Sequence, residues 1–413
     1  MSQTSQWSAH VSSMTPSLKI LQIVPSISLV YGGPSQMVLG FSQALADEGA
    51  EVTILTTDSN GDTGQAPLDV PLDCPVEQDG YQIYYFHCSP FRRYKFSLGL
   101  FQWLTHHAKE YDIAHIHALF SPVSSVSAAI ARSRALPYIL RPLGTLDPAD
   151  LHKKRRLKQL YAVALERPNL AGAAAIHFTS KQEATISERF GLKTHDLVMP
   201  LGVDVSEPLP NPQQILAQAG ISISPHVPLI LYMSRIDPKK GLDLLIPALE
   251  TCFTDGHDFQ VVLAGSNPQD PAYEDFIRHS IQSSPFATRT TITGFVSGQC
   301  KTALLQCADL FVLPSYYENF GISVAEAMAA KTPVLISDQV HIYPDVQRGD
   351  AGWVCECTRP SLIDQLKIAL SDADERQRKG ANAQQYAQTH YSWRAIAQQA
   401  IQTYHGILAK SDT

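Results

Sequence analysis

Short apolar runs alternate with amphipathic helical patterns along most of the chain. The first run, residues 19–25, is followed by a Gly-Gly-Pro turn and then by a helical pattern whose apolar face contains Met37, Val38, Phe41 and Leu45. A short apolar run followed by a helical period is typical of a strand–helix unit in a parallel sheet. The pattern therefore predicts an α/β protein.

The same rhythm continues and pauses once. Prolines crowd residues 204–228, which we interpret as a connector between an N-terminal domain at 18–203 and a C-terminal domain at 229–390. Parallel sheets of this kind bind ligands at the carboxyl edges of their strands, so we expect a ligand cleft between the domains. Further strands are expected at 52–56, 83–86, 113–116, 138–141, 174–178 and 197–198, and after the connector at 229–233, 260–264, 290–292, 310–313 and 333–336.

Length and composition fit two globular domains and exclude some classes of protein. A chain of 413 residues, 44% hydrophobic and 17% charged, suits two domains of roughly 180 to 200 residues each. Its net charge of −7 argues against general attraction to nucleic acid, so no nucleic-acid partner is expected. Seven scattered cysteines without a C-x-x-C motif predict neither a disulfide framework nor a zinc site, which favours a reducing compartment.

The sequence predicts no membrane-spanning segment. Residues 1–17 are polar and lack the basic-then-apolar order of a signal peptide, so we expect a disordered tail there. No apolar run reaches the ~18 residues that a spanning helix needs. We expect a cytoplasmic protein, with at most peripheral contact with the inner face of the plasma membrane.

A glycine turn lies between the first strand and its helix. Gly32 and Gly33 would let backbone N–H groups approach a ligand, and the helix start behind them favours anions. A tight turn without function explains them equally well. The segment lacks the G-x-G-x-x-G spacing of a dinucleotide site, but Asp58 after the second strand resembles the ribose-binding acid of a dehydrogenase. An NAD-dependent oxidoreductase is therefore an alternative.

Basic residues follow the first strand of the C-terminal half. Arg235 comes directly after the strand at 229–233, and Lys240 lies at the start of the next helix. A guanidinium fork and a lysine ammonium at one sheet edge suit two neighbouring phosphates. A solvated basic loop without function would show the same residues.

Two glutamates frame the helix that follows the strand at 310–313. Glu318 is expected in the loop and Glu326 inside the helix, where their carboxylates can accept hydrogen bonds from sugar or ribose hydroxyls. The backbone N–H groups that open the helix can hold a phosphate. A glutamate near a helix start also occurs without any function, so the spacing leaves both interpretations open.

These motifs, in this order, resemble one family. A Gly-Gly-Pro turn, S-R-x-x-x-K-K-G at 234–241 and P-S-x-x-E-N-F-G-x-x-x-x-E-A-M at 314–328 are similar to the retaining glycosyltransferases of family 4, the glycosyl transferases group 1, of the bacterial surface-polysaccharide type. The resemblance implies the GT-B fold, with two doubly wound Rossmann-like domains facing each other across a cleft. It also implies a final helix at 391–413 that crosses back to the N-terminal domain. Leu201 departs from the family's P-N-G-V-D connector, which has an asparagine there.

The resemblance implies roles for the residues on the donor side. Arg235 and Lys240 would bind a diphosphate. Glu318 would hold the transferred sugar and Glu326 the ribose. The other donor-binding residues implied are Gly32, Gly33, Val296 in the turn that contacts the nucleotide base, and the helix-opening residues Asn319, Phe320, Gly321 and Ile322.

The N-terminal half supplies the acceptor side and one further catalytic candidate. His117 resembles the second histidine of the family's H-x-H element, whose counterpart contacts the transferred sugar, while His115 would be supporting structure. Arg141 and Thr145 lie in a segment that resembles the acceptor-side loop. An arginine with a purely structural role is the alternative for Arg141.

The implied activity is transfer of a hexose, with retention of anomeric configuration, from a nucleotide-diphosphate sugar to a saccharide or lipid-linked acceptor in polysaccharide biosynthesis. UDP-glucose is the expected donor. No metal or other cofactor is expected, because the D-x-D motif at 372–374 lies outside any phosphate loop. Basic segments at 91–96 and 152–158 suit an anionic membrane as well as plain solvent. A hydrolase or epimerase of the same fold and a non-catalytic nucleotide-sugar-binding protein are the remaining alternatives.

Overall fold

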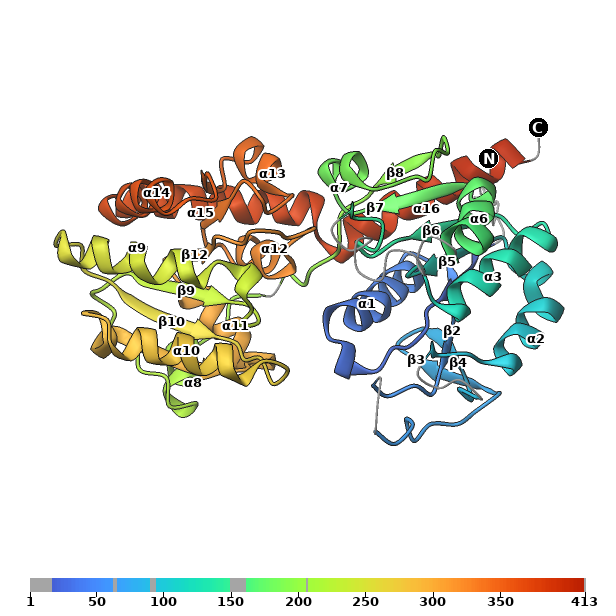
Figure 1. Cartoon of the computed structure of the whole chain (residues 1–413), viewed down its shortest axis with the longest axis horizontal. Helices are drawn as coiled ribbons and strands as arrows, with labels where there is room; N and C mark the ends of the chain where they lie inside the picture. The colour runs from blue at the N-terminus through green and yellow to red at the C-terminus, as the bar shows by residue number, and fades with distance from the viewer. Residues whose placement is uncertain (1–16, 62–64, 90–93, 149–160, 206, 412–413) are drawn as a thin grey trace, which may run out of the picture.

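The computed structural model describes residues 17–61, 65–89, 94–148, 161–205 and 207–411, and the chain forms two α/β domains (Figure 1). Each domain has a central sheet flanked by helices, as the alternating pattern predicts. The basic segment at 152–158, residues 91–93 and residues 1–16 of the tail lie outside the described part of the chain. None of the helices in that part is long and apolar enough to cross a membrane.

The N-terminal domain contains an eight-stranded sheet with the order β3-β4-β2-β1-β5-β6-β7-β8. Its neighbours are parallel except for β3 and β4, which pair in antiparallel fashion at one edge. The strands are β1 (Lys19–Ile23), β2 (Glu51–Thr57), β3 (Pro75–Gln78), β4 (Tyr81–Phe86), β5 (Ile113–His117), β6 (Tyr138–Arg141), β7 (Ala175–Phe178) and β8 (Asp196–Val198). The described helices include α1 (Gly33–Asp47), α2 (Leu98–His107), α3 (Pro122–Ser133), α6 (Arg167–Gly172) and α7 (Lys181–Ile186).

The C-terminal domain contains a six-stranded, fully parallel sheet with the order β11-β10-β9-β12-β13-β14. The strands are β9 (Leu229–Met233), β10 (Gln260–Ala264), β11 (Thr290–Gly294), β12 (Leu310–Leu313), β13 (Val334–Ser337) and β14 (Gly352–Cys355). The helices are α9 (Leu242–Thr254), α10 (Pro271–Gln282), α11 (Gly298–Cys307), α12 (Ile322–Ala329), α13 (Tyr343–Arg348), α14 (Arg359–Ser371), α15 (Ala373–His390) and α16 (Trp393–Ser411). Residues of β9, β10 and β12 are buried throughout, because helices cover both faces of the sheet.

The connector at 204–228 contains a helix of its own. α8 (Pro212–Gln218) packs against α11 of the C-terminal domain, and its Leu216 is fully buried. The second half of the connector therefore belongs structurally to the C-terminal domain.

Two chain segments cross between the domains and pair with each other. The backbone N–H of Val203 donates to the carbonyl of Tyr391 at 2.8 Å, and α16 then runs along the N-terminal domain against α1 (Figure 1). The ring of Trp393 lies against two glycines. A Cβ added to Gly40 or Gly202 would meet ring atoms at 2.6 and 2.0 Å. The ring of Trp393 thus packs α1 against the two segments that cross between the domains.

Candidate active site

The loops after β9 and β12 lie side by side at the carboxyl edge of the C-terminal sheet. The backbone N–H of Tyr316 donates to the carbonyl of Lys239 at 2.8 Å, which joins the two loops. Gly241 has a φ of 73°, and a Cβ there would come within 2.0 Å of the carbonyl oxygen of Pro314. Only glycine allows this close approach. The sequence thus places the S-R-x-x-x-K-K-G loop directly against the loop that carries Glu318.

Lys240 and Glu318 form an ion pair between these loops. The lysine Nζ contacts Oε2 of the glutamate, and the side chains are 15% and 23% exposed. The backbone of Glu318 is held by the loop before α13, since its N–H donates to Gln339 and its carbonyl accepts from His341, at 3.1 and 2.9 Å. The carboxylate is therefore positioned by the backbone and by one cation.

Arg235, in the same loop as Lys240, has a freer side chain. Its guanidinium is 54% exposed, and Nη2 is 3.6 Å from Oδ2 of Asp237. A long contact to an exposed guanidinium contributes little stability, so the group is available for an incoming anion. The loop after β9 thus carries one exposed cation, Arg235, and one paired and mostly buried cation, Lys240.

The residues that open α12 adopt a backbone that presents the helix start. Gly321 has a φ of 80°, and a Cβ on it would come within 3.3 Å of Cγ of Glu318. Phe320 is buried, with its ring 5.3 Å from that of Tyr391. Because the first N–H groups of a helix have no intrahelical partner, the start of α12 offers donors to an anion.

Glu326, one turn into α12, lines a cavity of about 560 Å³ between the domains. Gly33 at the start of α1 and Ile322 of α12 also line it, and a Cβ on Gly33 would lie 3.3 Å from Cδ1 of Ile322. Lys301 of α11 pairs with Glu326, with Nζ 2.7 Å from Oε1. The structure thus brings Gly33, Ile322 and Glu326 together and adds Lys301, which sequence reasoning missed.

The turn between β11 and α11 carries Val296, which is not among the residues that line this cavity. Val296 is partly buried against the core, whereas its neighbour Phe295 is 76% exposed. The turn leads directly into α11, the helix that carries Lys301. Val296 therefore stays a prediction, placed five residues before Lys301 in the chain.

The predicted acceptor-side loop contacts the C-terminal domain. The hydroxyl oxygen of Tyr317 lies 2.9 Å from Oδ2 of Asp147 and 2.6 Å from Oδ1 of Asn319. Burial raises the pKa of Tyr317 well above its usual value, so the hydroxyl stays protonated and able to donate. The hydroxyl of Thr145 is instead occupied within its own loop, where it donates to the carbonyl of Pro142 at 2.7 Å. Asp147 belongs to the segment that resembles the acceptor-side loop, but its interdomain contact with Tyr317 was not predicted.

His117 and Arg141 lie at the ends of the adjacent strands β5 and β6, with their side chains buried. Nε2 of His117 is 2.6 Å from Oε1 of Gln22, and Nδ1 has no hydrogen-bond partner among the described residues. Burial, together with the charge of Arg141, holds the pKa of His117 well below its usual range. Burial also lowers the pKa of Arg141 to about 10, and its Nη1 donates to Sδ of Met37. In this structure His117 is a neutral imidazole beneath the sheet edge rather than a side chain open to the cleft.

Asp58 is not placed to bind a ribose. It is 2% exposed, and its carboxylate lies 2.7 Å from Nδ1 of His87 and accepts from the N–H of Cys88. Both carboxylate oxygens are thus engaged within the protein. This arrangement removes the residue on which the dehydrogenase alternative depended.

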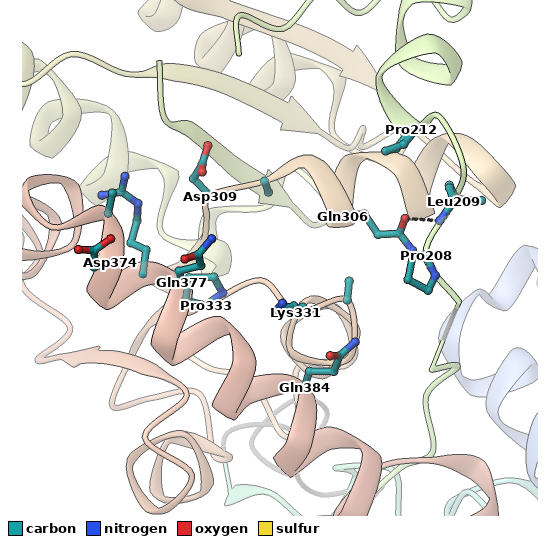
Figure 2. A pocket seen from close by; sticks show the side chains of 14 residues that line it. Pro208, Leu209, Pro212, Gln306, Asp309, Lys331, Pro333, Asp374, Gln377 and Gln384 are labelled. Atoms are coloured by element: carbon teal, nitrogen blue, oxygen red, sulfur yellow. Dashed lines mark hydrogen bonds between the residues drawn. The ribbon is translucent and has the colours of Figure 1, made fainter. Parts of the chain in front are cut away.

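A second cavity, of about 550 Å³, lies at the opposite edge of the C-terminal sheet (Figure 2). It is lined by Asp309 and Pro333, which precede β12 and β13, and by Gln306, which bonds to the connector at Leu209. It contains none of the predicted site residues. The candidate site is therefore the interdomain cavity together with the Lys240–Glu318 edge.

Two Rossmann-like domains, with Lys301 and Glu326 in a cavity between them, define the GT-B fold class. Residues 218–386 match the family described as "Glycosyl transferases group 1", and residues 32–202 match the "Glycosyl transferase 4-like domain". The chain belongs to the group 1 glycosyltransferases. This assignment excludes the oxidoreductase alternative and confirms the resemblance seen in the motifs.

Relatives with assigned activities are distant and differ among themselves. The chain is 28% identical over 306 residues to an alpha-D-kanosaminyltransferase of Streptomyces kanamyceticus, covering 73% of this chain and 69% of that protein. It is 24% identical over 397 residues to a D-inositol 3-phosphate glycosyltransferase of Jonesia denitrificans, covering 90% and 91%. Both are named as sugar transferases, and the two names specify different chemical groups.

Solved structures show the same fold. A sucrose-phosphate synthase from Thermosynechococcus elongatus superposes with a TM-score of 0.73 at 21% identity, covering 95% of this chain and all of that one. The Anabaena protein HepE, in complex with UDP and glucose, gives a TM-score of 0.70 at 20% identity, covering 94% and 100%. At these identities the likeness establishes the fold alone.

Proposed function

We propose that the protein transfers a hexose, with retention of anomeric configuration, from UDP-glucose to a saccharide or lipid-linked acceptor in polysaccharide biosynthesis. The observation that carries the proposal is the Lys240–Glu318 ion pair beside the accessible Arg235, at one sheet edge and next to the start of α12. This edge offers cations for a diphosphate and a carboxylate for sugar hydroxyls.

The residues divide the chemistry as follows. Arg235, Lys240 and the N–H groups at the start of α12 stabilise the diphosphate as it leaves with the electron pair of the broken glycosidic bond. Glu318 holds hydroxyls of the transferred sugar while the acceptor hydroxyl attacks the anomeric carbon from the same face. Fixed cations and a helix end replace a divalent ion, so we propose that no metal takes part.

The choice of donor and acceptor draws on the comparisons. HepE has been solved with UDP-glucose, and other relatives are named for inositol phosphate or maltose-1-phosphate products and acceptors. UDP-glucose is therefore the first donor to test, and a phosphorylated acceptor belongs in the acceptor panel. Contact with an anionic membrane is part of the proposal for lipid-linked acceptors.

The experiment is a thermal-shift and transfer panel of nucleotide sugars in EDTA. A ligand at 100 times its dissociation constant stabilises the folded state by about 2.7 kcal/mol, so the donor should stand out from other nucleotide sugars. NMR of the product should show the anomeric configuration of the donor. Inversion, a requirement for added Mg²⁺ or Mn²⁺, or full turnover without any acceptor would each contradict a part of the proposal, the last in favour of a hydrolase or epimerase.

A further inference from the structure

Lys301 occupies a position that helix stability does not explain. It is the fourth residue of α11, close to the positive end of the helix dipole, and the first turn contains no acidic residue. A cation there is unfavourable for the helix itself. The buried residues of α11 are Ala303, Leu304 and Leu305, so Lys301 is not part of its core face.

The partner of Lys301 lies on a different helix and faces the cavity. Nζ is 2.7 Å from Oε1 of Glu326 on α12, and the two side chains are 32% and 21% exposed. Oε2 of Glu326 has no hydrogen-bond partner among the described residues. Both side chains line the interdomain cavity, with Gly33 on the opposite domain. The pair therefore presents a fixed carboxylate with one free oxygen to the space between the domains.

We propose that Lys301 is a positioning residue of the donor site, which orients the carboxylate of Glu326 to accept hydrogen bonds from the ribose hydroxyls of the donor. The inference rests on the proposed function, since it takes the ribose of a nucleoside diphosphate as the ligand of this cavity. A carboxylate that an ion pair already holds in place loses less side-chain freedom when it binds a hydroxyl. Lys301 then acts through Glu326 and need not touch the donor.

Two other roles for the lysine give different results. A purely structural pair between α11 and α12 would affect the stability of the fold and not the recognition of ribose. A direct contact with the diphosphate would affect any nucleoside diphosphate equally. Recognition of the hydroxyls is therefore the property to measure.

The test is calorimetric titration of UDP and 2′,3′-dideoxy-UDP into the full chain and its variants. In Lys301→Met the dissociation constant for UDP should rise about tenfold, the scale of one charge-assisted hydrogen bond, while that for the dideoxy analogue should stay within about twofold. Lys301→Arg should restore most of the UDP affinity, because it keeps the cation. Lys367→Met is the matched control, since Lys367 pairs with Asp255 on the same domain away from the cavity.

The outcomes separate this inference from the function on which it rests. An equal loss for both nucleotides in Lys301→Met, or no loss for either, overturns the positioning role while the donor site stands. Failure of the wild-type chain to bind UDP at all contradicts the proposed donor and this inference with it. A melting temperature of Lys301→Met equal to that of Lys367→Met, combined with selective loss of ribose recognition, supports it.

Discussion

At the scale of single residues, the proposed diphosphate site depends on two cations with different surroundings. Lys240 is paired and mostly buried, whereas Arg235 is exposed and loosely held. We expect Lys240→Ala and Arg235→Ala to weaken UDP binding, by on the order of 2 to 5 kcal/mol for a desolvated contact. Calorimetry checks this, with the exposed neighbour Lys239→Ala as the matched control. Equal and small losses in all three variants would show that the segment is a solvated basic loop.

Sequence reasoning found residues that belong to a motif and missed residues that act through a partner. Glu318, Glu326 and Lys240 lie in conspicuous segments; in the structure Lys240 pairs with Glu318, and Glu326 lines the interdomain cavity. Lys301 has no motif of its own. The signal that was present is a lysine near the start of a helix that contains no acid in its first turn. The sequence placed His117 at the end of a strand but did not show that its side chain is buried. Strand alternation alone does not tell which face of the sheet the helix α16 covers.

At the scale of elements, the strand β14 was missing from the ranges expected for strands, and only alternate residues of it are buried. The other parallel strands were predictable because helices bury both of their faces and leave continuous apolar runs. The edge strand β3 was not, since it starts at Pro75, is mostly exposed and has little apolar pattern. The helix α8 was hidden in a proline-rich connector, where Pro212 begins the helix rather than ending one. The sequence pattern does not show which helices and strands contact one another.

The packing of Trp393 against Gly202, where the chain crosses between the domains, gives a prediction at this scale. Gly202→Ala would place a Cβ 2.0 Å from Cε3 of Trp393, so the ring or the crossing segment must move. We expect the free energy of unfolding to fall by about 1 to 3 kcal/mol, as for other overpacked sites. Gly406→Ala in α16 is the control, because nothing lies near its Cβ position and the change should stabilise by about 0.5 to 1 kcal/mol. Urea denaturation of both variants measures these changes. A free energy of unfolding for Gly202→Ala equal to that of the wild type would contradict the close packing of Trp393 against Gly202.

At the scale of the whole molecule, a buried histidine cluster joins the N-terminal sheet to the crossing helix. Nδ1 of His115 lies 2.7 Å from the hydroxyl of Tyr404 on α16, and its Nε2 lies 3.2 Å from Nδ1 of His177. Burial lowers the pKa of His177 to about 3 and holds the pKa values of His115 and His117 well below the usual range. The folded protein keeps all three rings neutral, whereas the unfolded chain protonates them below a pH of about 6.5.

The free energy of unfolding should therefore depend on pH in a defined direction. The contribution of this cluster is complete above about pH 6.5 and is lost as the pH falls, by about 1.4 kcal/mol per pH unit for each histidine. Urea denaturation between pH 7.5 and 5 measures the slope. His177→Gln should reduce it by one histidine's share, with the exposed His405→Gln of α16 as the control. A slope that is the same in both variants would mean that the cluster is not buried and neutral as described.

The central claim is that Glu318 and Glu326 divide the donor between them, one for the sugar and one for the nucleoside. The most direct measurement is steady-state transfer, paired with UDP titration, for Glu318→Ala and Glu326→Ala. Glu318→Ala should lower kcat by roughly 10² or more and bind UDP at least as tightly as the wild type, because Lys240 loses its competing carboxylate. Glu326→Ala should mainly weaken UDP and the sugar donor alike. If Glu318→Ala loses UDP affinity as severely as Glu326→Ala, the two carboxylates do not divide the donor.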